Sequence, residues 1–171
     1  QRSFYNGWKR VHGLKWQALV LANGMIADWW GPVAARHNDL YVLRVSQLHR
    51  RLEAAQLHQA QKFSVYGDSI YPVLQFITRR YSGRNLRADQ VQMNQQMSKI
   101  RESVEWTFAK LTDLWAFGDF KKNLQILKSP LPKLFGAAVL LTNCHTCLEG
   151  SIVSSYFDAG TPSLESYLGI E

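Results

Sequence analysis

The alternation of hydrophobic and polar residues predicts a β-hairpin near the start of the chain. Residues 15–22 and 25–30 are apolar runs that favour strands, and Asn23-Gly24 joins them. Asn-Gly between two such runs is the strongest short-range hairpin signal, because both residues tolerate the positive φ angles of a tight turn. Gly31-Pro32 is expected to close the second strand.

Helical spacing dominates the chain beyond this hairpin. Leucines near helical spacing predict a helix over residues 39–57, and a short apolar strand is expected over residues 62–67, followed by an irregular or briefly helical stretch. A last helix is expected over residues 134–148, and the Ser- and Gly-rich residues after Gly150 are expected to be extended or loose. The clearest helix carries one apolar stripe in steps of three and four, formed by Met97, Ile100, Val104, Phe108, Leu111 and Trp115.

This order of elements predicts an α/β fold in which helices cover a mixed sheet. A chain of 171 residues, 46% of them hydrophobic, is long enough for one sizeable core and too short for two. We therefore expect one domain over residues 1–150 and a C-terminal tail over residues 151–171.

Charge is unevenly distributed along the chain. All 20 Lys and Arg but only nine of the 13 Asp and Glu lie within residues 1–133, which leaves +11 there and −4 in the remainder. A basic body suggests a polyanionic partner such as DNA, because neutralised phosphates release counterions. A basic surface that serves only solubility explains the charge equally well.

The sequence also bears on the compartment. No apolar run approaches the roughly 20 residues that a membrane-spanning helix needs, and the first residues do not resemble a signal peptide. Cys144 and Cys147 are too few for a disulfide framework, and with His145 they are too few for a structural zinc site. We expect an intracellular protein, nuclear or cytoplasmic and not secreted, with no membrane partner. The first residue is not Met, so we expect a piece of a longer chain.

Two acidic residues lie where metal chemistry often occurs. Asp68 directly follows the expected strand, and Glu105 lies in the middle of the long helix, one residue beyond its apolar stripe. Two such carboxylates can converge on Mg²⁺ or Mn²⁺, which prefer oxygen ligands. The ordinary alternative makes Asp68 a turn residue and Glu105 a surface acid paired with Arg101, and spacing alone favours that alternative.

Short motifs surround both acids. The first motif is Gly67-Asp68-Ser69-Ile70-Tyr71-Pro72, and the second is Val104-Glu105-Trp106-Thr107-Phe108. They match, in the same order, the patterns Gly-Asp-x-x-Tyr-Pro and Val/Ile-Glu-x-x-Phe of the Harbinger family of transposases and transposase-derived nucleases. Over about residues 4–145 the chain resembles this family, which lies within the DDE superfamily. Further matching segments are Gly31-Pro32, Arg36-His37-Asn38-Asp39, the basic stretch Lys9-Arg10-Val11-His12, and Leu141-Thr142-Asn143.

The resemblance implies a ribonuclease H-like mixed sheet flanked by helices, and a metal-dependent endonuclease or transposase that cuts or transfers DNA strands. It implies that Asp68 and Glu105 are catalytic residues and ligands of Mg²⁺ or Mn²⁺, with Asp39 as an accessory or structural acid. The family's first catalytic Asp stands on a central strand in an Asp-Gly-Thr context, which does not occur in this chain. We therefore expect the domain to lack that first strand, and the chain alone to be inactive.

Basic residues near these motifs are candidates for DNA binding. The cluster between the two acids could hold phosphates, although a solvated loop explains it almost as well. Recognition of a DNA target is expected to lie in a separate protein or domain, and the oligomeric state stays open. Two other hypotheses are a domesticated or decayed, inactive relative that binds DNA or protein, and a basic domain without a nucleic-acid role. The candidate DNA-binding residues are Arg79, Arg80, Arg84, Arg87, Lys9 and Arg10.

Overall fold

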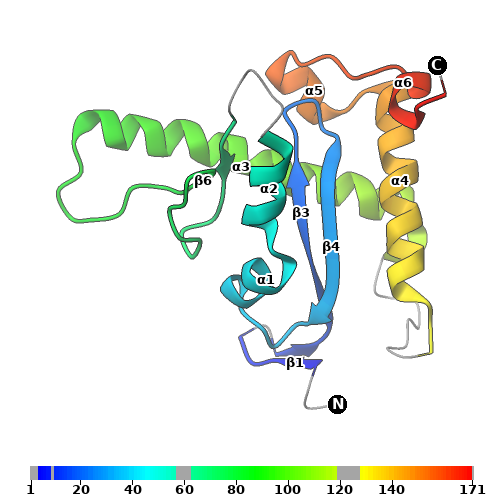
Figure 1. The fold of residues 1–171 in the computed structure, drawn as a ribbon, viewed down its shortest axis with the longest axis horizontal. Coiled ribbons are helices and arrows are strands. Elements are labelled where there is room, and N and C mark those ends of the chain that lie inside the picture. Colours follow the sequence, from blue (N-terminus) through cyan, green and yellow to red (C-terminus); the bar gives the residue numbers. More distant parts are fainter. Residues whose placement is uncertain (1–3, 9, 57–62, 119–127, 171) are drawn as a thin grey trace. The chain divides into compact units, whose positions relative to one another are not determined.

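A computed structural model describes residues 4–8, 10–56, 63–118 and 128–170 (Figure 1). The chain divides into two compact units. The first comprises Gln1–Lys15 and Val33–Arg101, and the second comprises Trp16–Pro32 and Glu102–Glu171. The β-hairpin and the longest helix have residues in both units.

The hairpin predicted from Asn23-Gly24 is confirmed. β3 (Leu14–Val20) pairs with β4 (Ile26–Ala34), and in the turn the N–H of Gly24, with a φ of 80°, donates to the Leu21 carbonyl over 2.9 Å. The expectation that Gly31-Pro32 closes the second strand is wrong, because β4 continues through it to Ala34. In its described sheet β4 has β3 as its one neighbour, and an edge strand tolerates a residue without an N–H donor.

The first unit contains two short pairs of strands and two short helices. β1 (Tyr5–Asn6) runs antiparallel to β2 (Val11–His12), and β5 (Val65–Tyr66) runs parallel to β6 (Ile77–Thr78). The helices are α1 (Asp39–Ser46) and α2 (Leu48–Gln56). Together with the hairpin this mixture confirms an α/β protein, but the strands of the described residues form three separate two-stranded sheets.

The single helix expected over residues 39–57 is wrong, because Gln47 interrupts it with a φ of 52°. Leu43 and Leu48 are five residues apart, a spacing that does not suit one face of a continuous helix. The break at Gln47 lets both leucines be buried, with exposed fractions of 5% and 6%.

The longest helix is α3 (Ala88–Leu114), which begins inside the stretch expected to be irregular. Its buried positions are Ser103, Thr107 and Leu111, whereas Ile100 is exposed, so the apolar stripe expected from the sequence is out of phase by about one residue. Thr107 Oγ1 donates to the Ser103 carbonyl over 2.9 Å. This bond satisfies the hydroxyl, and a satisfied hydroxyl can replace a larger apolar side chain at a buried position.

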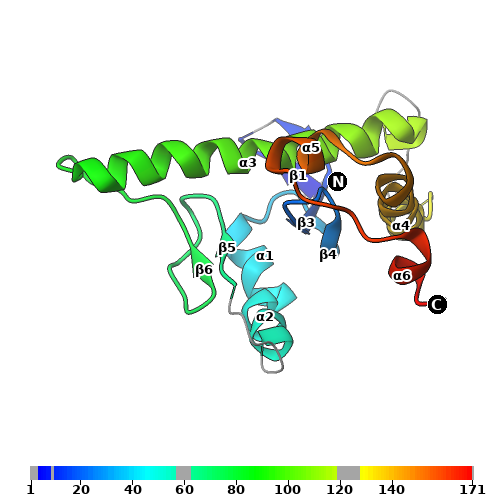
Figure 2. The same ribbon diagram turned by 90° about the horizontal axis from the view of Figure 1, so that it is seen from above.

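Aromatic side chains connect the hairpin to α3 and α4 (Leu131–Glu149) in the second unit (Figure 2). The Trp16 ring of β3 stacks on Trp29 of β4 at 5.9 Å between centroids, and it contacts Phe135 of α4 at 4.6 Å. Trp29 in turn contacts Phe108 of α3 at 6.1 Å. The hairpin therefore carries aromatic residues that contact both α3 and α4.

The loose tail expected after Gly150 is wrong, because these residues form α5 (Ile152–Phe157) and α6 (Leu164–Leu168). Ser151 and Ser154 form a capping box at the start of α5, and Ser163 caps α6. The serines thus begin helices here, since an N-cap needs a short side-chain acceptor. None of the described helices is long and apolar enough to cross a membrane.

Candidate functional site

The candidate site begins at the carboxyl ends of the parallel strands β5 and β6. Val65 lies opposite Ile77, and the N–H of Gly67 donates to the Thr78 carbonyl over 2.8 Å. Asp68 follows β5 and Arg79 follows β6, so both residues leave the same edge of this pair. Ligand sites in parallel sheets form outside the carboxyl ends of the strands, because loops converge there.

The Gly-Asp-x-x-Tyr-Pro motif is a tight turn that fixes Asp68. A Cβ atom at Gly67 would lie 2.9 Å from Tyr71 Cγ, so only glycine lets this ring lie against the backbone. Tyr71 N donates to the Asp68 carbonyl over 2.9 Å, and Ser69 N donates to Asp68 Oδ1 over 2.6 Å. The geometry of this turn therefore explains why glycine, aspartate and tyrosine occur at these positions, independently of any catalytic role.

Asp68 forms an ion pair with α3. Arg101 Nη1 lies 2.9 Å from Asp68 Oδ1, and the two side chains are 47% and 50% exposed. Sequence reasoning considered Arg101 only as a partner of Glu105, and an ion pair between segments so distant in sequence leaves no local signal. An ion pair this exposed contributes about 0–1 kcal/mol, so it leaves the carboxylate open to competition from a solvent cation.

Glu105 is exposed and lies on α3, four residues after Arg101. It belongs to the second unit, whereas Asp68 belongs to the first. The convergence of their carboxylates on one point stays a prediction.

Asp39 stands in the first turn of α1, beside the helix cap. Its Oδ1 pairs with Lys15 Nζ at 2.8 Å, and the same ammonium group donates to the His37 carbonyl over 2.9 Å. Asn38 caps the helix by accepting from Tyr41 N over 2.8 Å. These bonds tie α1 to β3 and supply a structural role for Asp39.

The fit of a divalent metal can be tested on the donor atoms present. Carboxylate oxygens such as those of Asp68 and Glu105 are the ligands that Mg²⁺ and Mn²⁺ take. Within residues 4–8, 10–56, 63–118 and 128–170, however, no group of three or more His, Cys, Asp or Glu could hold a metal ion. The donors fit by their chemistry, but their number does not complete a two-ion site.

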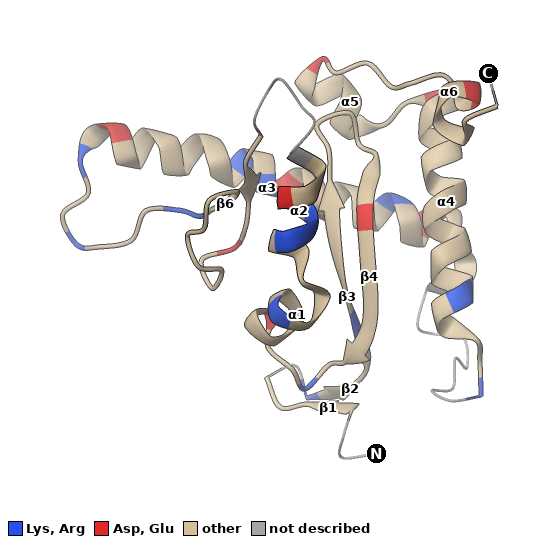
Figure 3. Cartoon of the chain, viewed as in Figure 1, with Lys and Arg blue, Asp and Glu red and all other residues tan. Residues whose placement is uncertain are grey.

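The candidate DNA-binding arginines lie between β6 and the start of α3, where Figure 3 shows several basic positions. Arg79 Nη1 donates to the Ser69 carbonyl over 2.7 Å. Arg87 donates two hydrogen bonds, of 3.1 and 2.9 Å, to the carboxylate of Asp89. Arg80 and Arg84 are exposed. The cluster thus combines two arginines engaged with the protein and two that face solvent.

The two other basic candidates precede β2. Arg10 is exposed, with a φ of 53°, and Lys9 lies outside the described residues.

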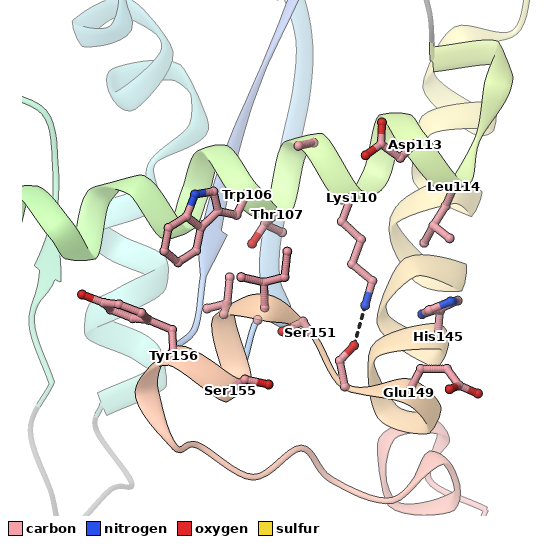
Figure 4. A pocket seen from close by; sticks show the side chains of 15 residues that line it. Trp106, Thr107, Lys110, Asp113, Leu114, His145, Glu149, Ser151, Ser155 and Tyr156 are labelled. Atoms are coloured by element: carbon pink, nitrogen blue, oxygen red, sulfur yellow. Dashed lines mark hydrogen bonds between the residues drawn. The ribbon is translucent and has the colours of Figure 1, made fainter.

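The second unit contains a cavity of about 830 Å³ between α3, the end of α4 and α5 (Figure 4). Lys110 of α3 donates to the Gly150 carbonyl over 2.6 Å and to Thr146 Oγ1 over 3.0 Å. Burial lowers the pKa of Lys110, and the nearby charge of Glu149 partly opposes this change. None of the candidate site residues lines this cavity, and sequence reasoning had no signal for it.

Comparison with known proteins identifies the family. A family model described as DDE superfamily endonuclease matches residues 1–143, which is 143 of the 171 residues. No curated protein and no solved structure matches the chain. The matched region contains the Asp39, Asp68 and Glu105 segments and ends within α4. The chain therefore belongs to the DDE superfamily of endonucleases.

Proposed function

We propose that this chain is part of a metal-dependent DNA endonuclease or transposase of the Harbinger type, with Asp68 and Glu105 as metal ligands. The observation that carries the proposal is the position of Asp68, an exposed carboxylate at the end of a parallel strand that contacts α3 through Arg101. Glu105 follows Arg101 by four residues on the same helix, and residues so spaced share a helix face. The parallel pair and the antiparallel hairpin are both compatible with a ribonuclease H-like fold.

In this proposal the chain's own residues orient oxygen donors toward the metal. The turn at Gly67 and Tyr71 fixes Asp68, and α3 presents Glu105, with Asp39 as an accessory or structural acid. When bound, a pair of Mg²⁺ or Mn²⁺ ions would activate a water molecule and stabilise the leaving phosphate-ester oxygen. The described residues by themselves supply too few ligands to hold two such ions.

DNA is the substrate that the family membership favours. Arg80 and Arg84, with their exposed guanidinium groups, are suited to phosphate contacts beside the cutting site. Such contacts carry no sequence information, so target choice would rest with another protein or domain. Action on nuclear DNA would place the protein in the nucleus.

Metal binding tests the ligand assignment directly. Electron paramagnetic resonance of free Mn²⁺ should show affinity reduced at least about tenfold, or about 1.4 kcal/mol, in Asp68→Asn and in Glu105→Gln. Asp113→Asn is the matched control, because it removes the same charge from an exposed position about two turns beyond Glu105 on the same helix. The Mn²⁺ affinity of this variant should stay within about twofold of the unchanged chain, since about 0.4 kcal/mol or less is expected from a distant surface charge. Equal losses in all three variants would contradict the assignment.

A plasmid-nicking assay tests the chemistry. We expect the 171-residue chain to leave supercoiled plasmid intact in Mg²⁺ or Mn²⁺, because two carboxylates supply too few ligands to hold two metal ions. A longer chain that supplies the Asp-Gly-Thr strand should nick, and Asp68→Ala should abolish that activity without loss of the fold. Metal-dependent nicking by the 171-residue chain that survives Asp68→Ala would place the active site elsewhere.

One observation favours a second candidate function, an inactive relative that binds DNA or protein. Arg101 already neutralises Asp68, as in a structural ion pair. Mn²⁺ binding that neither Asp68→Asn nor Glu105→Gln changes, together with intact DNA binding, would support this alternative.

A further inference from the structure

The turn between β1 and β2 presents a tryptophan almost entirely to solvent. Trp8 is 94% exposed, and it is flanked by Tyr5 at 41% and Val11 at 51%. Tryptophan is usually well buried, because its indole removes more apolar surface from water than any other side chain. By contrast, Trp16 and Trp29 of the β3–β4 hairpin stack on each other, with ring centroids 5.9 Å apart. Packing against the described residues therefore does not explain the position of Trp8.

The backbone that carries Trp8 is held in place. Asn6 Oδ1 accepts from Trp8 N over 3.0 Å, while Asn6 Nδ2 donates to the Ala35 carbonyl over 2.8 Å. Gly13 N donates to the Phe4 carbonyl, and Ala35 N donates to the Gly13 carbonyl. Asn6 and Gly13 are thus fastened to Ala35, directly after β4, and the bond from Trp8 N to Asn6 lowers the entropic cost of presenting the indole.

Basic residues lie close to Trp8 along the chain and next to the residue that anchors its turn. The chain holds four Lys and Arg before its first acidic residue, Asp28. Arg10 is exposed two residues after Trp8, and Arg36 is exposed directly after the anchoring Ala35. A partner suited to this surface combines negative charge with a flat apolar face.

We propose that the β1–β2 hairpin binds an unpaired nucleotide of DNA, with Trp8 stacked on the base and Arg10 and Arg36 near the flanking phosphates. Base–aromatic stacking beside a basic groove is how proteins hold single strands without sequence preference. Within a duplex each base is covered by its neighbours, so only the two ends offer the indole a free face. The inference deepens the proposed function, on which it rests: a strand-cutting enzyme meets unpaired nucleotides at nicks and ends.

Fluorescence anisotropy with labelled DNA tests the proposal on the whole 171-residue chain. The probes are a single-stranded oligothymidylate and a blunt duplex of equal length. Trp8→Ala should weaken single-strand binding by roughly 5- to 100-fold, the range for the loss of one stacked base, and change duplex binding by less than about twofold. Trp8→Phe, which keeps a ring, should recover part of the single-strand affinity, whereas Trp8→Leu, which keeps only apolar bulk, should not.

Two further variants separate stacking from charge and from damage to the hairpin. Val11→Ala alters an exposed neighbour on the same hairpin and should leave both affinities within about twofold, since it removes no stacked ring. Arg10→Gln should weaken binding to both DNA forms and lower the salt slope by about 1. Oligothymidylate should also quench the tryptophan fluorescence of the unchanged chain, and Trp8→Phe should remove most of that quenching.

The outcomes distinguish this inference from the proposed function. If Trp8→Ala and the unchanged chain bind each probe with the same affinity, the stacking site is overturned. The proposed function survives that result as long as Mn²⁺ still binds through Asp68 and Glu105. Equal weakening for both probes would make Trp8 a duplex contact, which also overturns it. Absence of binding to either probe at low salt would overturn both, and a change in self-association in Trp8→Ala without DNA binding would assign the indole to a protein partner.

Discussion

The guanidinium group of Arg101 lies 2.9 Å from a carboxylate oxygen of Asp68. The pair joins the end of β5 to α3, and it places a positive charge where the proposed function requires a metal ion. The Arg101 guanidinium group and a bound metal ion would therefore compete for the same carboxylate oxygen.

This competition makes a prediction for Arg101→Met. Removal of the guanidinium should raise the affinity for Mn²⁺ by about two- to fivefold, because like charges a few ångströms apart in a half-exposed setting repel by up to about 1 kcal/mol. The gain in Mn²⁺ affinity should be absent when Arg101→Met is combined with Asp68→Asn. Titration with Mn²⁺ followed by electron paramagnetic resonance measures both affinities. Lys99→Met, on the same helix, serves as the control for loss of one positive charge, and a similar gain there would show a general field effect.

The arginines between β6 and α3 should contribute unequally to DNA binding. Arg80→Gln and Arg84→Gln should each lower the salt slope of duplex binding by about 1, since each removes one phosphate contact. Arg87→Gln should have a smaller effect, because Asp89 already holds this guanidinium through two hydrogen bonds. Anisotropy titrations at several salt concentrations measure the slopes. A slope unchanged by all three substitutions would exclude the cluster as the DNA contact.

Asn143 of α4 should be a main determinant of stability. Its amide accepts from Ile26 N over 2.9 Å and donates to the Ile26 carbonyl over 3.0 Å, and both residues are buried. Asn143→Ala leaves two buried backbone groups without partners, which should lower the free energy of unfolding by at least about 2 kcal/mol. Urea denaturation followed by circular dichroism measures this loss.

The chain provides a matched control for Asn143. Asn94 makes the same two bonds, to the N–H and carbonyl of Tyr81 at 2.8 and 3.0 Å, but in an exposed position. Water can replace those bonds, so Asn94→Ala should cost less than about 1 kcal/mol. Equal costs for the two substitutions would show that burial of the Asn143 bonds is not what stabilises α4 on the hairpin.

Lys110 should make stability rise with pH on the alkaline side. Burial lowers its pKa below the ordinary 10.5 of the unfolded chain, so the unfolded state binds more protons in the window that ends near 10.5. The free energy of unfolding therefore rises with pH through this window, as the cost of the buried charge is relieved. Urea denaturation at neutral pH and at pH near 10 should show this rise, and Lys110→Met should reduce it, while the exposed Lys99→Met should not.

Elements with local signals could be predicted from the sequence. Asn23-Gly24 specifies the turn between β3 and β4 without help from distant residues, because its backbone preferences are intrinsic. The motif of Gly67, Asp68 and Tyr71 is likewise local, since its bonds lie within five residues. The motifs around Asp68 and Glu105 also led to the DDE superfamily, which the family match over residues 1–143 confirms.

Only the tertiary structure decided which local options were taken. The serines after Gly150 suit loops and helix caps alike, and α5 forms with Val153 buried to 2% exposure. The buried face of α3 follows Ser103 and Thr107 rather than the largest apolar side chains. The Arg101–Asp68 and Asn143–Ile26 contacts span 33 and 117 residues of chain. Spacing along a sequence encodes neighbours within a few turns, whereas such pairs depend on how whole elements pack, and that packing is decided by shape and by the need to satisfy buried polar groups.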